Sequence, residues 1–329
     1  MTEKHTSFKI VKYTSAYYNE WNGFIENSKN GTFLFHRDFM EYHKDRFEDF
    51  SLLVFKEDKL LAVLPANKLE QEIHSHQGLT YGGLILPKMV KFDTVIAVFA
   101  QLLKYLKGYG FETLVLKQIP SIYSKVFTEE IEFLMFILKA ELIRKDTLSV
   151  IDLNNKLKIS NNRLEGYKRG VKHNLIVKEE AGFELFWNNI LVKNLQNRHK
   201  ANPVHTLQEI TLLKKHFPNN IRQFNVYNQD EIVAGTTIFE SRFVVHSQYI
   251  SGNADKNTLG SLDFLHYHLI TEVFKDKKYF DFGTSNENNG LHINEGLQFW
   301  KEGFGARMLT QNFYRVPINN YQLLNNVFI

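Results

Sequence analysis

The strongest constraint on the fold of this chain is an internal repeat. The segment FKEDKLLA at residues 55–62 aligns with YNQDEIVA at residues 227–234, and Asp58 falls on Asp230. Each segment joins two apolar runs through a polar turn, which predicts a β-hairpin. In both halves the hairpin is followed by a predicted strand, a long amphipathic helix and a buried strand. A repeat of this size predicts two similar domains.

The order of strands and helices predicts a fold of the α/β (α+β) class with two tandem units. Each unit is expected to contain a mixed, mostly antiparallel sheet flanked by helices. The chain has 329 residues, and domains commonly contain roughly 100–200 residues. We place the first domain at residues 1–155 and the second at residues 156–329. Within the first, a strand is predicted at residues 79–86, interrupted by Gly82 and Gly83.

Composition excludes several classes of chemistry. The chain contains no cysteine, so it forms no disulfide, no thiolate zinc site and no cysteine nucleophile. Its first residues lack the apolar stretch of a secretory signal, and no apolar run reaches the length of a membrane span. These features favour a cytoplasmic location. The net charge of +4 is too small to indicate nucleic acid as a partner. No set of three metal ligands is evident, so no metal site is predicted.

A basic segment at residues 160–180 separates the two halves. It contains Arg163, Lys168, Arg169 and Lys172. Arg169 and Lys172 are three residues apart, so they share one face of a predicted helix. Charge runs of this kind are often solvated helix surfaces. The functional interpretation is a wall that faces the phosphates of a substrate, which makes these four residues candidates for substrate binding.

The main candidates for chemistry lie within residues 279–314. A buried strand is predicted to end at Asp281, and a short helix then places Lys301 just before Phe304. A lysine is a compact charge suited to a phosphate or a developing oxyanion, although the helix dipole also favours lysine at a helix end. Asp281 is expected either to accept the proton of a nucleophile or to cap a turn. We take Lys301 and Asp281 as the catalytic candidates.

Four further residues are candidates for substrate binding. Asn286 follows Asp281 in a polar loop, where asparagine either reads polar groups or forms a turn. Phe304 lies between two glycines that let the backbone approach a ligand. Tyr249 and Tyr267 are expected either to face a cleft or to belong to the core. The sequence motifs of serine hydrolases, P-loop NTPases and dinucleotide enzymes are absent.

The closing segment, FDFG followed by FWKEGFGAR, and the order of the two halves resemble the Fem-like (FemAB-type) acyltransferases. These are tandem GNAT-fold proteins, and they include the aminoacyltransferases that build peptidoglycan cross-bridges. The basic residues from Arg163 to Lys172 resemble the segment that opens their second domain, and Tyr81-Gly82-Gly83 resembles a glycine pair of their first. The chain lacks the long helical-hairpin insertion of many tRNA-using members. It is therefore similar to the shorter bacterial branch, which is often described as GNAT-like acetyltransferases.

The resemblance implies an enzyme, an acyltransferase of the tandem GNAT type with acyl-CoA as the donor and no metal. The second domain is expected to hold the donor and the chemistry, and the first to form a wall of the acceptor cleft. GNAT enzymes bind the pyrophosphate of coenzyme A through a glycine-rich loop. The corresponding loop at residues 251–261 keeps only part of that motif. Gly260 and Ser261 are therefore the cofactor-binding candidates.

The implied acceptor is an amino or hydroxyl group on a cell-envelope or polysaccharide precursor, which is a small molecule, a glycan or a peptide. The basic segment would pair with its phosphates. One alternative is an aminoacyl-tRNA-dependent transferase on the same scaffold, with tRNA as a partner. The modest net charge and the missing helical insertion do not favour it. The other alternative is a non-catalytic binding protein that kept the fold.

Overall fold

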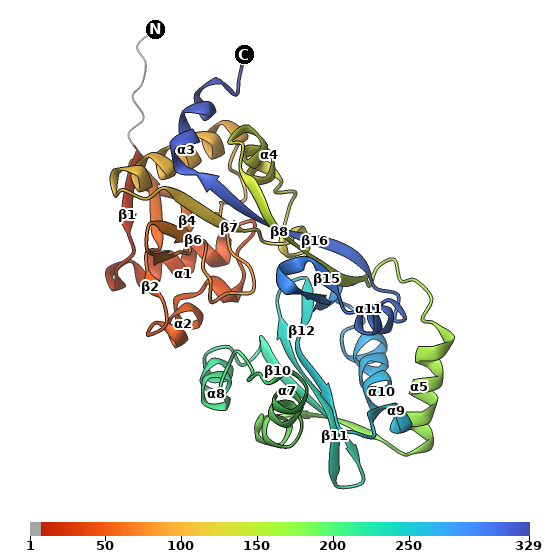
Figure 1. The fold of residues 1–329 in the computed structure, drawn as a ribbon. Coiled ribbons are helices and arrows are strands. Elements are labelled where there is room, and N and C mark those ends of the chain that lie inside the picture. The colour runs from red at the N-terminus through yellow and green to blue at the C-terminus, as the bar shows by residue number, and fades with distance from the viewer. Residues whose placement is uncertain (1–7) are drawn as a thin grey trace. The chain divides into compact units, whose positions relative to one another are not determined.

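The computed structural model describes residues 8–329, apart from the side chains of Arg198 and His199. The chain divides into two compact units, the first comprising the residues up to Lys145 together with Gln311–Ile329, and the second comprising Asp146–Thr310 (Figure 1). The C-terminal segment thus belongs to the first unit, whereas the linear boundary expected from the sequence assigned it to the second.

The first unit packs around one long helix. Its helices are α1 (Tyr18–Asn27), α2 (Arg37–Met40), α3 (Phe92–Gly108) and α4 (Glu130–Ile137), and its strands are β1 (Phe8–Lys12), β2 (Glu48–Asp49), β3 (Leu52–Lys56), β4 (Lys59–Leu64), β5 (Asn67–Leu69), β6 (Glu72–His74) and β7 (Thr113–Lys117). The apolar stripe of α3, from Val95 to Leu106, is buried in the core. Val316 and Leu324 of the C-terminal segment are buried in the same core, which explains why that segment belongs to this unit.

The second unit holds a six-stranded arrangement flanked by helices. It contains α5 (Asn161–Lys172), β9 (Ile176–Glu180), α6 (Glu184–Phe186), α7 (Val192–His199), α8 (Leu207–His216), β10 (Ile221–Asn228), β11 (Glu231–Glu240), β12 (Val244–Gly252), α9 (Lys256–Leu259), α10 (Ser261–His268), β13 (Tyr279–Thr284), β14 (Asn286–Glu287), β15 (His292–Ile293) and α11 (Glu295–Glu302). The strand order is β8-β13-β12-β11-β10-β9, where β8 is Glu141–Asp152. Helices α5 and α10 lie on one face of this sheet, and α7 and α8 lie on the other (Figure 1).

The internal repeat predicted from the sequence is present in the two units. The repeated segments form the hairpins β3–β4 and β10–β11. Each unit also contains a parallel pair joined through a helix, β6–α3–β7 in the first and β12–α10–β13 in the second. Parallel neighbours require such a crossover. The remaining pairs within each sheet are antiparallel, so the predicted mixed, mostly antiparallel architecture is confirmed.

Each sheet includes a strand that crosses the boundary between the units in the sequence. Strand β7 of the first unit pairs with β16 (Arg307–Pro317), which follows the second unit in the sequence. Strand β13 of the second unit pairs with β8, which follows the first unit in the sequence. The first unit is therefore completed by a segment that is distant in the sequence, whereas the second unit is continuous.

The strand predicted at residues 79–86 is reduced to isolated bridges. Gly82 pairs with Gln118 and Ile85 with Val63. A Cβ at Gly82 would lie 1.5 Å from the carbonyl oxygen of Ser75, so the backbone passes another segment too closely for any side chain. A positive φ of 101° at Gly83 then breaks the extended conformation that a continuous ladder requires.

Glycines let α5 pack tightly on α10. The outer residues of α5 are exposed, and its buried residues are Gly166 and Gly170. A Cβ at Gly166 would overlap the Asp263 carboxylate, and one at Gly170 would overlap Phe264. Gly260, which precedes α10, has a φ of +66°, and a Cβ there would lie 2.0 Å from the carbonyl oxygen of Gly166. The helices are therefore held at a separation that only glycine permits.

Replacing Gly260 by alanine is expected to lower the free energy of unfolding by about 2 kcal/mol, because it adds backbone strain to a steric overlap with another helix. Gly110 is a matched control, since its φ is +83° but a Cβ there meets nothing within 4 Å. Gly110→Ala is expected to cost about 1 kcal/mol, the strain alone. Urea unfolding of both variants measures the difference, and equal costs would mean that the helices move apart freely.

The described residues contain no helix that is both long enough and apolar enough to cross a membrane.

Candidate functional site

Strands β12 and β13 separate in the middle of the second unit. Their parallel pairing runs from Val244 and Tyr279 to His246 and Asp281, yet β12 continues to Gly252. On its other edge β12 stays paired with β11. Thr237 pairs with Tyr249 and Ile238 pairs with Ser247, so Gln248 is an extra residue that forms a β-bulge. Bulges bend a strand and increase its twist. In the described part of the chain, the β12 edge beyond His246 therefore has no strand partner on the β13 side.

Strand β13 carries a second irregularity at the same level. Its register with β8 shifts between Asp281 and Thr284. Gly283 adopts a φ of +69°, and its N–H donates to Asp281 Oδ1 at 2.7 Å. A glycine in the left-handed region is typical of a bulge that turns a strand out of its ladder. The two bulged strands thus diverge from a common point, and the space between them is open.

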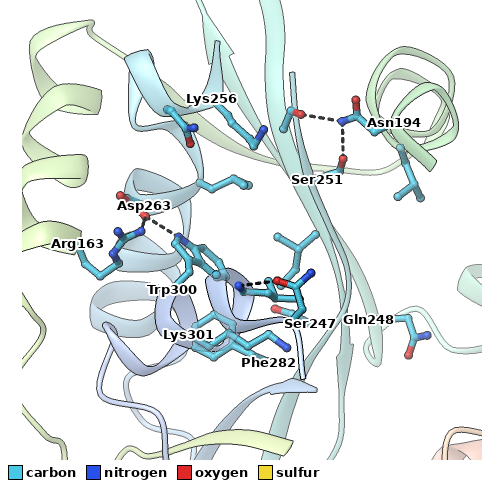
Figure 2. Close-up of a pocket in the computed structure, with 18 of the residues that line it drawn as sticks. Arg163, Asn194, Ser247, Gln248, Ser251, Lys256, Asp263, Phe282, Trp300 and Lys301 are labelled. Atoms are coloured by element: carbon cyan, nitrogen blue, oxygen red, sulfur yellow. Dashed lines mark hydrogen bonds and ion pairs between the residues drawn. The ribbon is translucent and has the colours of Figure 1, made fainter. Parts of the chain in front are cut away.

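A cavity of about 740 Å³ occupies this space. Such a volume is typical of sites for small molecules and cofactors. Its wall is partly apolar, with Leu195, Ile250, Leu262, Phe282, Leu297 and Trp300, and partly polar, with Arg163, Arg169, Asn194, Ser247, Gln248, Ser251, Lys256, Asn257, Asp263, Thr284, Asn294 and Lys301. Figure 2 shows the labelled side chains on α5, α7, β12, α10 and α11 around the cavity, with the Gln248 side chain pointing away from the others. All of these elements belong to the second unit.

Lys301 is a buried lysine on the wall of this cavity. Its side chain is 1% exposed, and its Nζ donates to the carbonyl oxygens of Gly283 at 3.0 Å and Thr284 at 2.7 Å. Burial lowers the pKa of Lys301 to about 8, while the nearby Asp281 carboxylate opposes the shift. An ammonium has three hydrogens, so the two carbonyls leave one N–H for a group in the cavity. The α11 segment places this charge beside the bulge of β13.

Asp281 is fully engaged behind the cavity wall. It is 1% exposed and accepts from the Gly283 N–H, and its Oδ2 lies 2.9 Å from His246 Nδ1. It does not line the cavity. Successive side chains of a strand point to opposite faces, so Asp281 lies on the face of β13 opposite Phe280 and Phe282, which are buried in the core. The carboxylate is therefore placed to fix the bulge, orient His246 and act on Lys301 electrostatically.

A second polar cluster joins three helices at another part of the wall. Asp263 Oδ1 of α10 accepts from Arg163 Nη1 of α5 at 2.8 Å and from Trp300 Nε1 of α11 at 2.7 Å (Figure 2). Burial raises the pKa of the Asp263 carboxyl, and the Arg163 guanidinium opposes this shift. Asn194 of α7 similarly ties the end of β12, since its Nδ2 donates to Ser251 Oγ at 2.8 Å and to the Gly252 carbonyl at 2.7 Å. These contacts fix the shape of the cavity.

The predicted site residues divide between the cavity wall and its surroundings. Lys301, Arg163 and Arg169 line the cavity. Lys168 and Lys172 are exposed on α5 outside the lining, and Lys168 pairs with Glu165 at 2.7 Å.

The aromatic and amide candidates make internal contacts instead. Tyr249 Oη lies 2.7 Å from His205 Nδ1, and Tyr267 stacks on Tyr167 with ring centroids 4.0 Å apart. Asn286 Oδ1 accepts from the backbone N–H and the hydroxyl of Thr147, each at 2.7 Å. Phe304 is buried in the core at 1% exposure.

The cofactor-binding candidates Gly260 and Ser261 lie under α5. Both residues are buried, and neither lines the cavity. Gly260 packs against the backbone of Gly166 in α5, whereas Leu262 and Asp263 of the first turn of α10 line the cavity. Open backbone N–H groups at a helix N-terminus are what binds a pyrophosphate. The cations that line the cavity are instead side chains, Arg169 on α5 and Lys256 on α9.

Sequence reasoning missed the polar residues of β12. Ser247 is buried, and neither its Oγ nor Gln248 Oε1 has a hydrogen-bond partner among the described residues. Buried polar atoms are normally paired, and Ser247 Oγ is such an unpaired atom in a residue of the cavity wall. A bulge depends on the register with β11 and leaves no local signal in the sequence. The short polar run around Ser247 within an apolar strand was the available hint. Among the described residues no group of three metal-ligating side chains was found.

The chain is similar to several solved structures, at identities that establish the fold alone. No protein-family model matches it, and no curated protein matches it significantly in sequence. The structure of FemX superposes with a TM-score of 0.65 at 11% identity, covering 96% of this chain and 99% of FemX. The L-PGS structure from Bacillus licheniformis gives 0.55 at 14% identity, covering 80% and 83%. A tandem GNAT protein from the clavulanic acid biosynthesis pathway gives 0.50 at 10% identity, covering 95% and 99%.

Proposed function

We propose that this chain, which has the Fem-like tandem GNAT fold, is an acyltransferase. It would move an acyl group from acyl-CoA to an amino or hydroxyl group of a cell-envelope or polysaccharide precursor. The observation that carries the proposal is the cavity between the diverging strands β12 and β13, with a buried cation at Lys301 and a free strand edge. Fold alone does not fix function, so the proposal rests on this cavity.

The chemistry of acyl transfer matches the groups that line the cavity. The nucleophile attacks the acyl carbon and loses its proton, a tetrahedral oxyanion forms, and the carbonyl is restored as the carbon–sulfur bond breaks and coenzyme A leaves as the thiol. A preorganised donor in a water-poor site stabilises such an oxyanion strongly. The free N–H of Lys301 supplies a positive donor, and the unpaired edge of β12 at Ser247 and Gln248 supplies backbone groups. Asp281 would keep Lys301 charged, because a carboxylate favours the protonated form of a nearby amine.

Arg169 and Lys256 would hold the phosphates of the donor, because both cations line the cavity. The apolar part of the wall would cover the acyl and pantetheine chain. The basic residues outside the cavity, Lys168 and Lys172, remain candidates for the acceptor. The residues present therefore fit an acyl-CoA whose phosphates are bound by side chains of the cavity wall.

Arg169→Ala is expected to weaken acyl-CoA binding about 10–100-fold, since a hydrogen bond to a charged group contributes about 1.5–3 kcal/mol. Lys168 is the matched control, because it is the next residue of the same helix and lies outside the lining. Lys168→Ala is expected to change donor binding less than about twofold. Thermal shift titrations with acetyl-CoA and a longer acyl-CoA measure both. Equal effects of the two variants would remove Arg169 from the donor site.

A wider panel tests the function itself. Ligand at a hundred times its dissociation constant should stabilise the protein by about 2.7 kcal/mol. We expect stabilisation by acyl-CoA, and release of free coenzyme A thiol when an amine-bearing nucleotide sugar is added. If neither acetyl-CoA nor the longer acyl-CoA stabilises the protein, the proposed donor is wrong.

The second candidate is an aminoacyl-tRNA-dependent transferase. The absence of Gly260 and Ser261 from the cavity lining favours it, because these residues would otherwise be expected to contact the pyrophosphate of coenzyme A. This candidate predicts binding of charged tRNA that weakens steeply with salt, since phosphate contacts release counterions. A binding titration at two salt concentrations separates it from the acyl-CoA proposal.

A further inference from the structure

Helix α4 of the first unit is apolar on both faces. Its sequence is EIEFLMFI, and Ile131, Leu134 and Met135 are buried in the core. Phe133 and Phe136 point outward and are 44% and 78% exposed. A surface helix normally carries polar residues on its outer face. Phe136, the more exposed of the two, therefore contributes little to the packing of this unit.

Two neighbouring segments extend the exposed apolar surface. Phe127, just before α4, is 99% exposed, and Met89, just before α3, is 85% exposed. The rings of Phe92 and Phe133 are 5.6 Å apart, so the start of α3 lies beside α4. We call Met89, Phe127, Phe133 and Phe136 the aromatic face. In the described part of the chain these four side chains remain exposed, and gathered apolar side chains of this kind mark interaction surfaces.

Lysines surround the aromatic face. Lys88 and Lys91 flank Met89 in sequence, and Lys125 and Lys139 lie at the two ends of the α4 segment. Lys125 Nζ donates to the Glu26 carbonyl. The exposed acidic residues in the same segments are Asp93 and Glu129.

Two carboxylates of α4 are turned inward. Glu130 pairs with the buried Lys29, and Glu132 accepts from the Tyr314 hydroxyl. Burial, reinforced by neighbouring carboxylates, raises the pKa of the Glu129 carboxyl. The outer rim of the aromatic face is therefore net positive.

We propose that the aromatic face docks the protein onto the surface of an anionic lipid bilayer. Protruding phenylalanines with a lysine rim are typical of interfacial insertion, because the rings enter the acyl boundary while the ammonium groups stay at the headgroups. Each lysine near an anionic surface adds to the attraction. Lysine is depleted at protein–protein interfaces, so a protein partner fits this rim less well. The proposal is independent of the acyl-transfer proposal, since bilayer binding requires no catalysis.

Co-sedimentation of the full chain with vesicles tests the docking. We expect the protein to pellet with phosphatidylcholine vesicles that contain phosphatidylglycerol, and much less with phosphatidylcholine alone. The double variant F127S/F136S should lower the partition coefficient at least about 10-fold, because two inserted rings are lost. Phe299→Ser is the matched control, since Phe299 is 60% exposed on α11 of the second unit, and it should bind like the wild type.

A charge pair separates insertion from simple attraction. Lys91→Glu should weaken binding to anionic vesicles several-fold more than Lys59→Glu, which makes the same change of net charge at the tip of the β3–β4 hairpin. Failure of the wild type to pellet with anionic vesicles would overturn the proposal, as would equal binding by F127S/F136S. A wild-type dimer that F127S/F136S dissociates, without any vesicle binding, would assign the face to a second copy of this chain instead.

Discussion

Replacing Lys301 by methionine is expected to slow the proposed acyl transfer about 10²–10³-fold, the usual effect of losing one preorganised stabiliser of an oxyanion. Methionine fills a similar volume and removes the charge and all three donors. The wild-type ammonium is held by the Gly283 and Thr284 carbonyls at the cavity wall, so it needs little reorganisation when negative charge develops. The rate of coenzyme A thiol release under saturating donor and acceptor measures the loss.

Stability must be separated from catalysis in this variant. Methionine leaves the two carbonyls without their donor, and a buried unsatisfied group costs about 1–3 kcal/mol. The rate is therefore compared below the unfolding transition, with folding checked by circular dichroism. Lys156→Met, an exposed lysine of the same unit, is the control for loss of charge and should retain the wild-type rate. A folded Lys301→Met variant with the wild-type rate would exclude Lys301 from the chemistry.

Much of the fold is predictable from local patterns. The repeated hairpin, the amphipathic helix at Phe92–Gly108 and the buried strand at Thr113–Lys117 each follow from periodicity and turn residues within a short window. The pairing of β16 with β7 and of β8 with β13 has no such signal. Both strands read as ordinary strands, and their partners lie far along the chain. A boundary drawn along the sequence cannot represent a unit built from two separate segments.

The residues of the candidate site also divide into those set by local sequence and those set by distant contacts. Lys301 was identifiable from its setting beside glycines, and Arg163 and Arg169 from local charge. The contact between Arg163 and Asp263, which are 100 residues apart, arises from glycine-mediated packing of α5 on α10. Ser247 and Gln248 reach the cavity through a bulge that only the register with β11 specifies. Residues placed by local sequence were therefore found, and those placed by tertiary packing were missed.

The stability of the wild type relative to Lys301→Met is expected to rise by about 2–3 kcal/mol between about pH 7 and pH 10. Burial lowers the pKa of Lys301 from 10.5 to about 8 in the folded state. Between these two values the unfolded chain binds more protons than the folded chain, so the free energy of unfolding increases with pH. Below about pH 8 both states carry the proton, and the folded state bears the full cost of a buried charge. One pKa unit corresponds to about 1.4 kcal/mol.

Urea unfolding of both proteins at several pH values measures this difference. Other titrating groups are shared by the wild type and the variant, so their contributions cancel. Lys156→Met again serves as the control, because it removes an exposed lysine of the same unit. If the difference in the free energy of unfolding between the wild type and Lys301→Met stays constant with pH, then the ammonium is solvated rather than buried. The free N–H would then face bulk water, where a single charge stabilises an oxyanion far less, and the catalytic assignment of Lys301 would lose its physical basis.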